Sequence, residues 1–245
     1  MPKNNSSSKA KSSGNTGNRL KSKLLGTFYG HPLKDMKLVA ITGSTGRTEV
    51  AHFVHEILKA AGQPVAILAS EDEIKIGALH KFLSEAWKAG ANYVVVTTPA
   101  KSLRDDVFYG LPVHIAALTN FIPSSLSDLT PKEYLAAEST LFKMKPEYAI
   151  LNRDDENYED FREFAGDKGT ITYGSDRLCN IQVTNSRLYK KGVEANLAIG
   201  TTRFTVASFL TGEPVVNYMA AAAAIANTLH VAPEKITEGI ANYEA

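Results

Sequence analysis

From residue 38 onward, short apolar runs alternate with longer stretches in which apolar residues recur with helical spacing, and this alternation constrains the fold more than any other feature. The expected strands cover residues 38–42, 65–68, 93–97, 115–118 and 148–151. The expected helices cover residues 48–61, 76–89, 131–143, 216–229 and 233–242. Strands that are separated by helices pair in parallel and are covered on both faces. The sequence therefore predicts an α/β fold, a mostly parallel sheet with helices on both faces.

The segment 180–210 departs from this alternation. It contains short β segments with a turn near Lys191 and Gly192, a pattern typical of antiparallel hairpins. We therefore expect antiparallel strands at an edge of the sheet, late in the chain.

Residues 1–23 differ in composition from the rest of the chain. They are mainly Ser, Lys, Asn and Gly, and they lack the apolar h-region that a secretory signal requires. Such a segment buries too little apolar surface to offset the entropy lost on ordering. We expect residues 1–23 to form a disordered, basic tail and residues 24–245 to form one domain.

Charge and cysteine content exclude several classes of partner and site. The 27 Lys and Arg residues nearly balance the 26 Asp and Glu residues, so no overall field favours nucleic acid or an anionic membrane. No apolar run approaches the ~20 residues of a membrane helix. Cys179 is the only cysteine, which excludes an intrachain disulfide and suits a reducing compartment. We therefore expect a local binding site, and neither nucleic acid nor a membrane as a partner.

A glycine-containing loop joins the first expected strand to the first expected helix. It consists of Gly43, Ser44, Thr45, Gly46, Arg47 and Thr48. At such a junction, backbone N–H groups and the helix N-terminus can hold a phosphate group. The strict Walker A pattern fails at two positions, because Ile41 replaces its first Gly and Arg47 replaces its Lys. From the loop alone, an anion site and an ordinary strand-to-helix turn remain equally open.

The loop sequence TGSTGRT resembles the TGTNGKT loop of the Mur ligase family, and further segments match that family in the same order. They are Phe28–Pro32, Thr119 with Asn120, Glu133–Ala137, Leu141 with Phe142, Asn152 with Asp154 and Asp155, Tyr173 with Gly174, and Asn217 before an alanine-rich helix. Within the family, the chain is similar to the UDP-N-acetylmuramoyl-peptide ligases that add the third residue of the peptidoglycan stem. The resemblance implies a central domain that binds ATP, phosphorylates a carboxylate and lets an amine attack the acyl phosphate. It also implies a cytoplasmic location, where these precursors are made.

The resemblance further implies which residues bind the nucleotide. They are Gly43, Ser44, Thr45, Gly46, Arg47, Thr48, Asn120, Asn152, Asp155 and Asn217, with Thr48 as a candidate metal ligand. Asn217 matches the second of two asparagines that reach the adenine, whereas Pro214 occupies the first position. Ordinary structural roles remain open for Asn217 at a helix N-terminus and for the acidic run 154–156 as capping carboxylates.

Several positions that carry chemistry in the family are substituted in this chain. Thr97 stands where the family has a metal-binding Glu, and Lys101 stands where it has a His. Mg²⁺ prefers carboxylate and phosphate oxygens as ligands, so we expect nucleotide binding to depend little on Mg²⁺. The segment between Leu68 and Leu79 is shorter than in the family and lacks the residues that contact the muramoyl substrate there.

Two glutamates near the expected site have more than one interpretation. Glu138 aligns with the family's carbamylated lysine, and its carboxylate is the kind of group that carbamylation would create. The sequence favours the alternative, a solvated helix glutamate. Glu49 lies in the first turn of the expected helix, where it suits the helix dipole but would repel a triphosphate.

Two functional hypotheses follow. The first is an ATP-dependent, amide-forming ligase of peptidoglycan precursor synthesis that is catalytically impaired in this chain, because the metal carboxylate, the substrate contacts and the flanking domains are missing. The second is a non-catalytic pseudoenzyme or scaffold that acts through a partner protein, which would also supply the missing domains. The expected small-molecule partner is a nucleotide, although under the second hypothesis the chain could also bind no small molecule.

Overall fold

The computed structural model describes residues 16–123 and 129–244, so the first part of the predicted tail, residues 1–15, lies outside the described residues. The strands are β1 (Lys37–Thr42), β2 (Val65–Leu68), β3 (Tyr93–Thr97), β4 (Val113–Leu118), β5 (Tyr148–Asn152), β6 (Thr170–Gly174), β7 (Ile181–Tyr189), β8 (Gly192–Ile199) and β9 (Thr202–Ser208). The helices are α1 (Thr16–Phe28), η1 (Pro32–Lys34), α2 (Arg47–Ala60), α3 (Ile76–Lys88), α4 (Ala100–Arg104), α5 (Pro131–Lys143), α6 (Tyr158–Ala165), α7 (Pro214–Thr228) and α8 (Pro233–Ala241).

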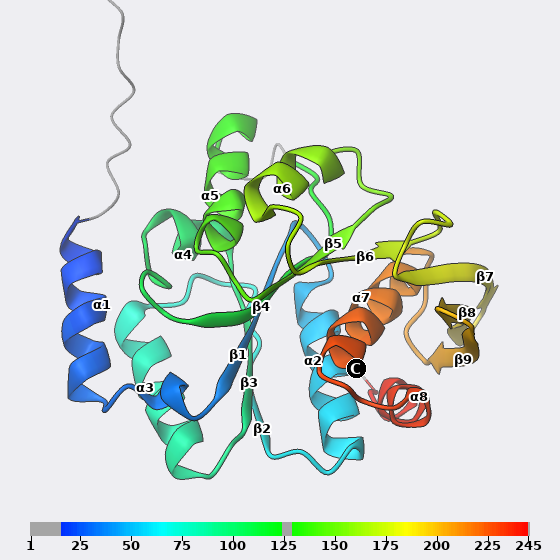
Figure 1. The fold of residues 1–245 in the computed structure, drawn as a ribbon, viewed down its shortest axis with the longest axis horizontal. Coiled ribbons are helices and arrows are strands. Elements are labelled where there is room, and N and C mark those ends of the chain that lie inside the picture. The colour runs from blue at the N-terminus through cyan, green and yellow to red at the C-terminus, as the bar shows by residue number, and fades with distance from the viewer. Residues whose placement is uncertain (1–15, 124–128, 245) are drawn as a thin grey trace, which may run out of the picture.

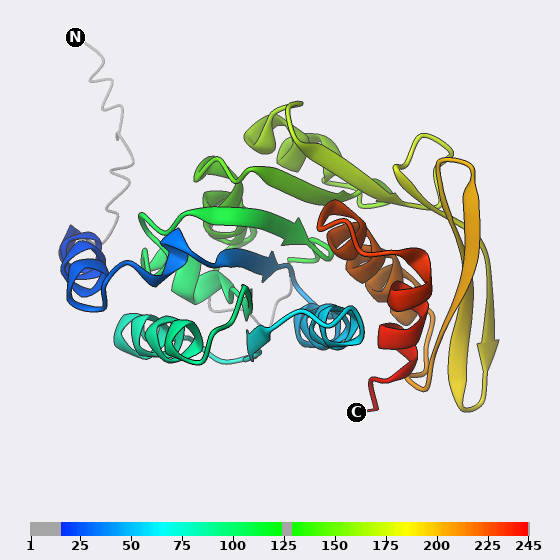
Figure 2. The same ribbon diagram turned by 60° about the horizontal axis from the view of Figure 1, so that its bottom comes forward.

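The strands form one sheet in the order β2-β3-β1-β4-β5-β6-β7-β8-β9 (Figures 1 and 2). Neighbouring strands from β2 through β7 pair in parallel, whereas β7, β8 and β9 pair antiparallel. The β7–β8 hairpin turns after Tyr189, which pairs with Gly192. The predicted α/β fold and its late antiparallel edge are therefore both confirmed.

β1 lies between β3 and β4, and its side chains point alternately to the two faces of the sheet. Val39 and Ile41 join a core with α2, α7 and α8, whereas Leu38 and Ala40 join a second core with α3, α4, α5 and α6. All four side chains are fully buried. A strand that is covered on both faces has no solvated side, which explains the continuous apolar run in the sequence. The predicted helices on both faces are confirmed (Figure 2).

The alanines of α7 allow this helix to pack closely against the sheet. Every residue from Ala220 to Ala224 is at most 1% exposed, and the small side chains let the helix backbone approach the sheet closely. Despite this apolar surface, neither α7 nor any other helix in the described part of the chain is long and apolar enough to cross a membrane.

The N-terminal segment corrects one prediction. Thr16–Lys23 was expected to be disordered, but it forms the first part of α1, which packs against α3 (Figure 1). Arg19 pairs with Asp106 at 2.8 Å, and the buried Ser22 hydroxyl donates to the backbone oxygen of Tyr109 at 2.8 Å. These contacts are made to residues far along the chain. The composition of residues 16–23 does not indicate these contacts. The predicted start of the domain, residue 24, was therefore too late in the chain.

The sequence analysis did not predict α4 or β6, and it gave no bounds for α6, the helix that follows the acidic run 154–156. α4 has 5 residues and α6 has 8, which is too short for apolar periodicity to separate a helix from a loop. β6 pairs with β5 on one side and β7 on the other, and its Tyr173 is fully buried. Its assignment as a strand therefore depends on its neighbours in the sheet.

Candidate functional site

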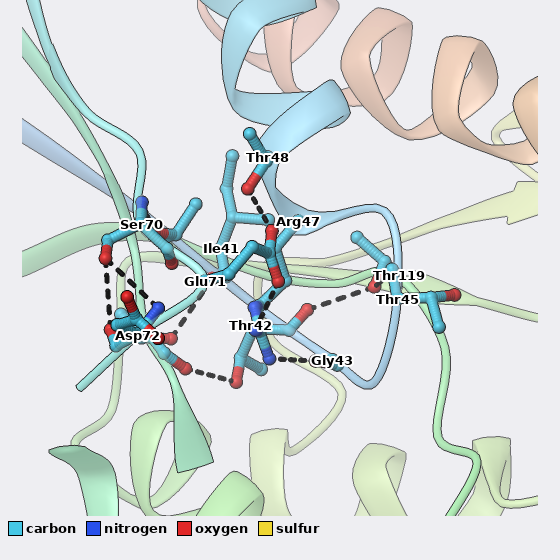
Figure 3. A network of polar contacts seen from close by, with 12 residues as sticks. Ile41, Thr42, Gly43, Thr45, Arg47, Thr48, Ser70, Glu71, Asp72 and Thr119 are labelled. Carbon is cyan, nitrogen blue, oxygen red and sulfur yellow. Dashed lines mark hydrogen bonds and ion pairs between the residues drawn. The ribbon is translucent and has the colours of Figure 1, made fainter. Parts of the chain in front are cut away.

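The glycine loop lies at the carboxyl end of β1, where the chain turns into α2. The carboxyl ends of β3 and β4, which flank β1 in parallel, lie beside it. In open parallel sheets this edge is where ligands bind. The structure confirms that residues 43–48 join a strand to a helix, and Figure 3 shows the polar contacts around this junction.

Both glycines of the loop are required by its backbone and by its packing. Gly43 has φ 131°, and a Cβ atom there would lie 2.1 Å from Oγ1 of Thr119. Gly46 has φ 77°, and a Cβ atom there would lie 2.1 Å from the ring of Tyr218 on α7. Residues other than glycine rarely adopt these backbone angles. The loop is thus held closely between the end of β4 and the start of α7.

Side chains after β4 hold the loop in one conformation. Asn120 accepts from the amide of Thr45 at 3.0 Å and donates to Thr45 Oγ1 at 2.8 Å. The Thr119 hydroxyl donates to the carbonyl of Thr45 at 2.6 Å, and the Ser44 hydroxyl accepts from the amide of Ile122 at 2.7 Å. Asn120 and Ser44 therefore fix the shape of the loop, and their predicted contact with nucleotide stays a prediction.

The start of α2 leaves hydrogen-bond donors free. Gly46 is the N-cap residue and makes no side-chain cap hydrogen bond. Within the described part of the chain, no acceptor binds the backbone amides of Gly46, Arg47 or Thr48. Free amides at the positive end of a helix dipole form a binding site for an anion.

Arg47 is folded into the loop and is only 7% exposed. Its Nη1 donates to the carbonyl oxygen of Gly43 at 2.7 Å, and its Nη2 pairs with Oε2 of Glu71 at 2.9 Å. Its Nε atom is buried and has no hydrogen-bond partner among the residues that the structure describes. Glu71 also accepts a hydrogen bond from the hydroxyl of Thr48 (Figure 3). The sequence analysis did not identify Glu71, because this residue follows β2 and has no motif around it.

Thr97 positions the segment that carries Glu71. The buried Thr97 hydroxyl accepts from the amide of Ser70 at 2.8 Å and donates to the carbonyl oxygen of Ser70, also at 2.8 Å. Thr97 lies at the carboxyl end of β3, at the position where the sequence comparison found a carboxylate missing. Its hydroxyl is thus engaged by the chain itself.

Glu138 corrects a second prediction. The sequence favoured a solvated helix glutamate, but Glu138 is fully buried and accepts a hydrogen bond from the hydroxyl of Thr42 at the end of β1. Burial raises the pKa of Glu138 to about 7, and the Thr42 hydrogen bond and the charge of Arg47 offset part of that rise. Its Oε1 atom has no hydrogen-bond partner in the described part of the chain. The inward side of α5 cannot be recognised from the sequence, because Glu138 interrupts the apolar face of the helix.

Asn152 and Asp155 support the segments beside the loop. Asp155 accepts from the amide of Phe121 at 2.6 Å and from the amide of Asn157 at 2.9 Å, which ties the end of β4 to the start of α6. The side-chain amide of Asn152 donates to the carbonyl oxygen of Thr119 at 3.4 Å. Both residues lie at the edge of the sheet where they were expected, and these contacts are structural.

Asn217 lies at the fourth position of α7, which begins at Pro214 and so starts earlier than expected. It is half-buried, and among the described residues no hydrogen bond engages its side chain. The hydroxyl of the next residue, Tyr218, lies 3.1 Å from Thr45 Oγ1. The start of α7 thus borders the loop, and the predicted contact of Asn217 with adenine stays a prediction.

A parallel sheet with a two-glycine loop between an interior strand and the following helix defines a P-loop type of α/β domain. Comparison with known families agrees with this architecture. The Mur ligase middle domain matches residues 41–226. The chain belongs to the Mur ligase family, of which it contains the middle domain.

Individual proteins are similar to this chain over most of its length, in sequence or in fold. The UDP-N-acetylmuramoyl-L-alanyl-D-glutamate–2,6-diaminopimelate ligase of Solibacter usitatus is 28% identical over 237 residues, which cover 89% of this chain and 48% of that enzyme. The crystal structure of MurF from Acinetobacter baumannii aligns with a TM-score of 0.79 at 21% identity, covering 93% of this chain and 50% of MurF. This chain thus spans about half the length of these ligases.

A third relative was solved with nucleotides. The folylpolyglutamate synthase of Mycobacterium tuberculosis, complexed with ADP and AMPPCP, aligns with a TM-score of 0.74 at 12% identity. The alignment covers 93% of this chain and 63% of the synthase. At this identity the likeness concerns the fold alone.

Proposed function

We propose that the chain binds ATP through the loop of residues 43–48. The observation that carries this proposal is the rigid loop, which Asn120 and Tyr218 hold against an uncapped helix N-terminus with free amides. An ordinary strand-to-helix turn does not require two glycines that pack closely against neighbouring side chains. Such a turn is also usually followed by a helix whose first amides are capped. The ADP and AMPPCP complexes of a relative with the same fold support the same ligand.

Each loop residue has a proposed part in binding. The amides of Gly46, Arg47 and Thr48 donate to phosphate oxygens, while Gly43 lets the backbone approach them. Arg47 supplies positive charge, and its unpartnered Nε is a further donor. We assign Asn217 to the adenine end, because the start of α7 borders the loop.

The proposed reaction class is the ATP-dependent formation of an amide bond in peptidoglycan precursor synthesis, in the cytoplasm, with this chain catalytically impaired. Two observations support the impairment. The Thr97 hydroxyl is bound to Ser70, and Glu138, at the position of the family's carbamylated lysine, is buried against Thr42. A carboxyl group whose pKa is about 7 carries only part of a negative charge at neutral pH.

A second candidate, a non-catalytic scaffold that binds a partner protein, is favoured by one feature of α1. Leu20, Leu24 and Phe28 follow one another at intervals of four residues and are 61%, 63% and 79% exposed. Residues at this spacing share one face of a helix. An exposed apolar helix face of this kind is typical of a surface that a protein partner covers.

Titration calorimetry with ATP tests the proposed nucleotide site. Charge-assisted hydrogen bonds contribute ~1.5–3 kcal/mol each, so Arg47→Ala should weaken binding about ten- to hundredfold. Arg47→Lys keeps the charge and should retain most of the affinity. Arg203→Ala, on the exposed surface of β9, is the matched control and should change nothing. Undetectable binding at millimolar ATP by the parent, with the fold intact by circular dichroism, would leave the scaffold as the better hypothesis.

A further inference from the structure

Glu71 places a carboxylate at the loop, and ATP binding alone gives it no role. Its Oε2 lies 2.9 Å from Nη2 of Arg47, and its second oxygen accepts from the hydroxyl of Thr48. The side chain of Glu71 is 62% exposed, whereas that of Arg47 is 9% exposed. The carboxylate therefore reaches inward from the surface to the two side chains that begin α2 (Figure 3).

The backbone on both sides of Glu71 is fixed. Thr97 binds the amide and the carbonyl of Ser70 on the preceding side. On the following side, the Ser70 hydroxyl accepts from the amide of Asp72 at 3.2 Å and lies 3.1 Å from its carbonyl oxygen. A carboxylate on a segment that is held in this way is preorganised for a ligand, unlike an acid on a free surface loop.

Two buried polar atoms around the loop lack hydrogen-bond partners among the described residues. Among the described residues, Arg47 Nε and Glu138 Oε1 are the buried side-chain atoms without a hydrogen bond, and both residues adjoin the loop. Buried polar groups in folded proteins are nearly always paired. The unpaired Nε of Arg47 therefore indicates that a ligand with acceptor oxygens completes the site.

We propose that Glu71 and Thr48 together bind a divalent cation, Mg²⁺, that arrives on the phosphates of the nucleotide. Mg²⁺ is usually held by one or two carboxylates, substrate phosphates and water, and a carboxylate with a hydroxyl fits that donor set. Without a cation, the carboxylate would repel the phosphates. The inference rests on the proposed binding of ATP at residues 43–48.

The donor set also explains why the cation needs the nucleotide. In the described part of the chain, no group of three or more His, Cys, Asp or Glu residues is arranged to hold a metal. One carboxylate and one hydroxyl are too few for the bare ion, so the phosphates must supply further ligands. Thr97 has no carboxylate of its own, but it binds Ser70 and so positions the segment that carries the carboxylate of Glu71. The inference predicts the opposite of the sequence-based expectation, which was that nucleotide binding depends little on Mg²⁺.

Calorimetric titration of ATP, with excess Mg²⁺ or with EDTA, tests this inference on the full chain. In the parent, Mg²⁺ should tighten binding about tenfold or more, which is the effect expected of one charge-assisted contact. Glu71→Gln should lose most of that gain, and in EDTA it should bind ATP at least as tightly as the parent, because no carboxylate then repels the phosphates. Glu73→Gln is the matched control, because Glu73 is also exposed in the same segment and should keep the full gain.

The possible outcomes separate the inference from the proposed function. ATP binding that Mg²⁺ does not change in the parent would overturn the role of Glu71 and leave the nucleotide site standing. Tighter binding by Glu71→Gln, equally with and without Mg²⁺, would show that the carboxylate competes with phosphate and would also overturn the inference. No ATP binding by any of the three proteins would overturn both proposals. Mn²⁺ alone, followed by electron paramagnetic resonance, should bind none of them detectably.

Discussion

The hydroxyl of Thr42, at the end of β1, donates a hydrogen bond to the carboxyl group of Glu138 on α5, and both side chains are fully buried. The contact joins the strand that leads into the loop to a helix on one face of the sheet. Since no described residue forms a hydrogen bond with Glu138 Oε1, the carboxyl group is only partly compensated for its loss of water. A group in this position makes the stability of the protein depend on pH.

The pKa of Glu138 predicts the direction of that dependence. Its value rises from 4.5 to about 7 on folding because of burial, so the folded state binds the proton more tightly than the unfolded state does. The resulting stability is fully present below pH 4.5 and is lost as pH rises through 7. Between these limits the free energy of unfolding should fall by up to about 3 kcal/mol.

Urea unfolding at pH 5 and pH 8 measures this loss. Glu138→Gln has no titrating group and should abolish most of the difference between the two pH values. The exposed Glu163→Gln serves as the control and should behave like the parent. An equal pH dependence in the parent and in Glu138→Gln would contradict the prediction.

Two glycine substitutions should change stability in opposite directions. Gly46→Ala forces a side chain into φ 77° and against the ring of Tyr218, so it should destabilise the protein by about 2 kcal/mol or more. Gly77→Ala, on α3, meets open space and should stabilise it by about 0.5–1 kcal/mol. Thermal unfolding of both variants checks the pair. A neutral Gly46→Ala would mean that the loop is not held against α7.

Truncation at the N-terminus tests the correction to the predicted tail. A protein that begins at residue 24 loses the buried hydrogen bond between Ser22 and Tyr109, whereas one that begins at residue 16 keeps it. The shorter protein should therefore be less stable than the longer one by at least about 1 kcal/mol. Chemical denaturation of the two proteins measures the difference, and equal midpoints would show that α1 adds nothing to the domain.

The proposed impairment predicts an enzymatic result. The chain alone should not add an amino acid to UDP-N-acetylmuramoyl-dipeptide in the presence of ATP, because the Thr97 hydroxyl is engaged by Ser70 and the chain spans about half the length of the active relatives. Phosphate release is the measurement. Release that requires both the dipeptide and the amino acid would refute the impairment, whereas slow hydrolysis of ATP alone would not.

The succession of most helices and strands along the chain could be predicted from the sequence alone. Apolar runs and helical stripes reflect burial on one or two faces, so they predicted β1, α2, α5 and the parallel sheet. The glycine loop was equally recognisable, since the chain changes from strand to helix within Gly43–Thr48. The order of the matching segments was sufficient to identify the family.

Only the tertiary structure decided which side chains meet at the loop. Glu71 reaches Arg47 from a segment after β2, and Tyr218 reaches Gly46 from α7. The sequence analysis considered Glu49 and Glu138 as carboxylates near the site, whereas Glu71 is the carboxylate that contacts Arg47 and Thr48. The spacing of apolar residues along a segment predicts whether that segment forms a helix or a strand. Contacts between residues far apart in sequence depend on how strands are ordered and how helices pack, so they carry no local signal.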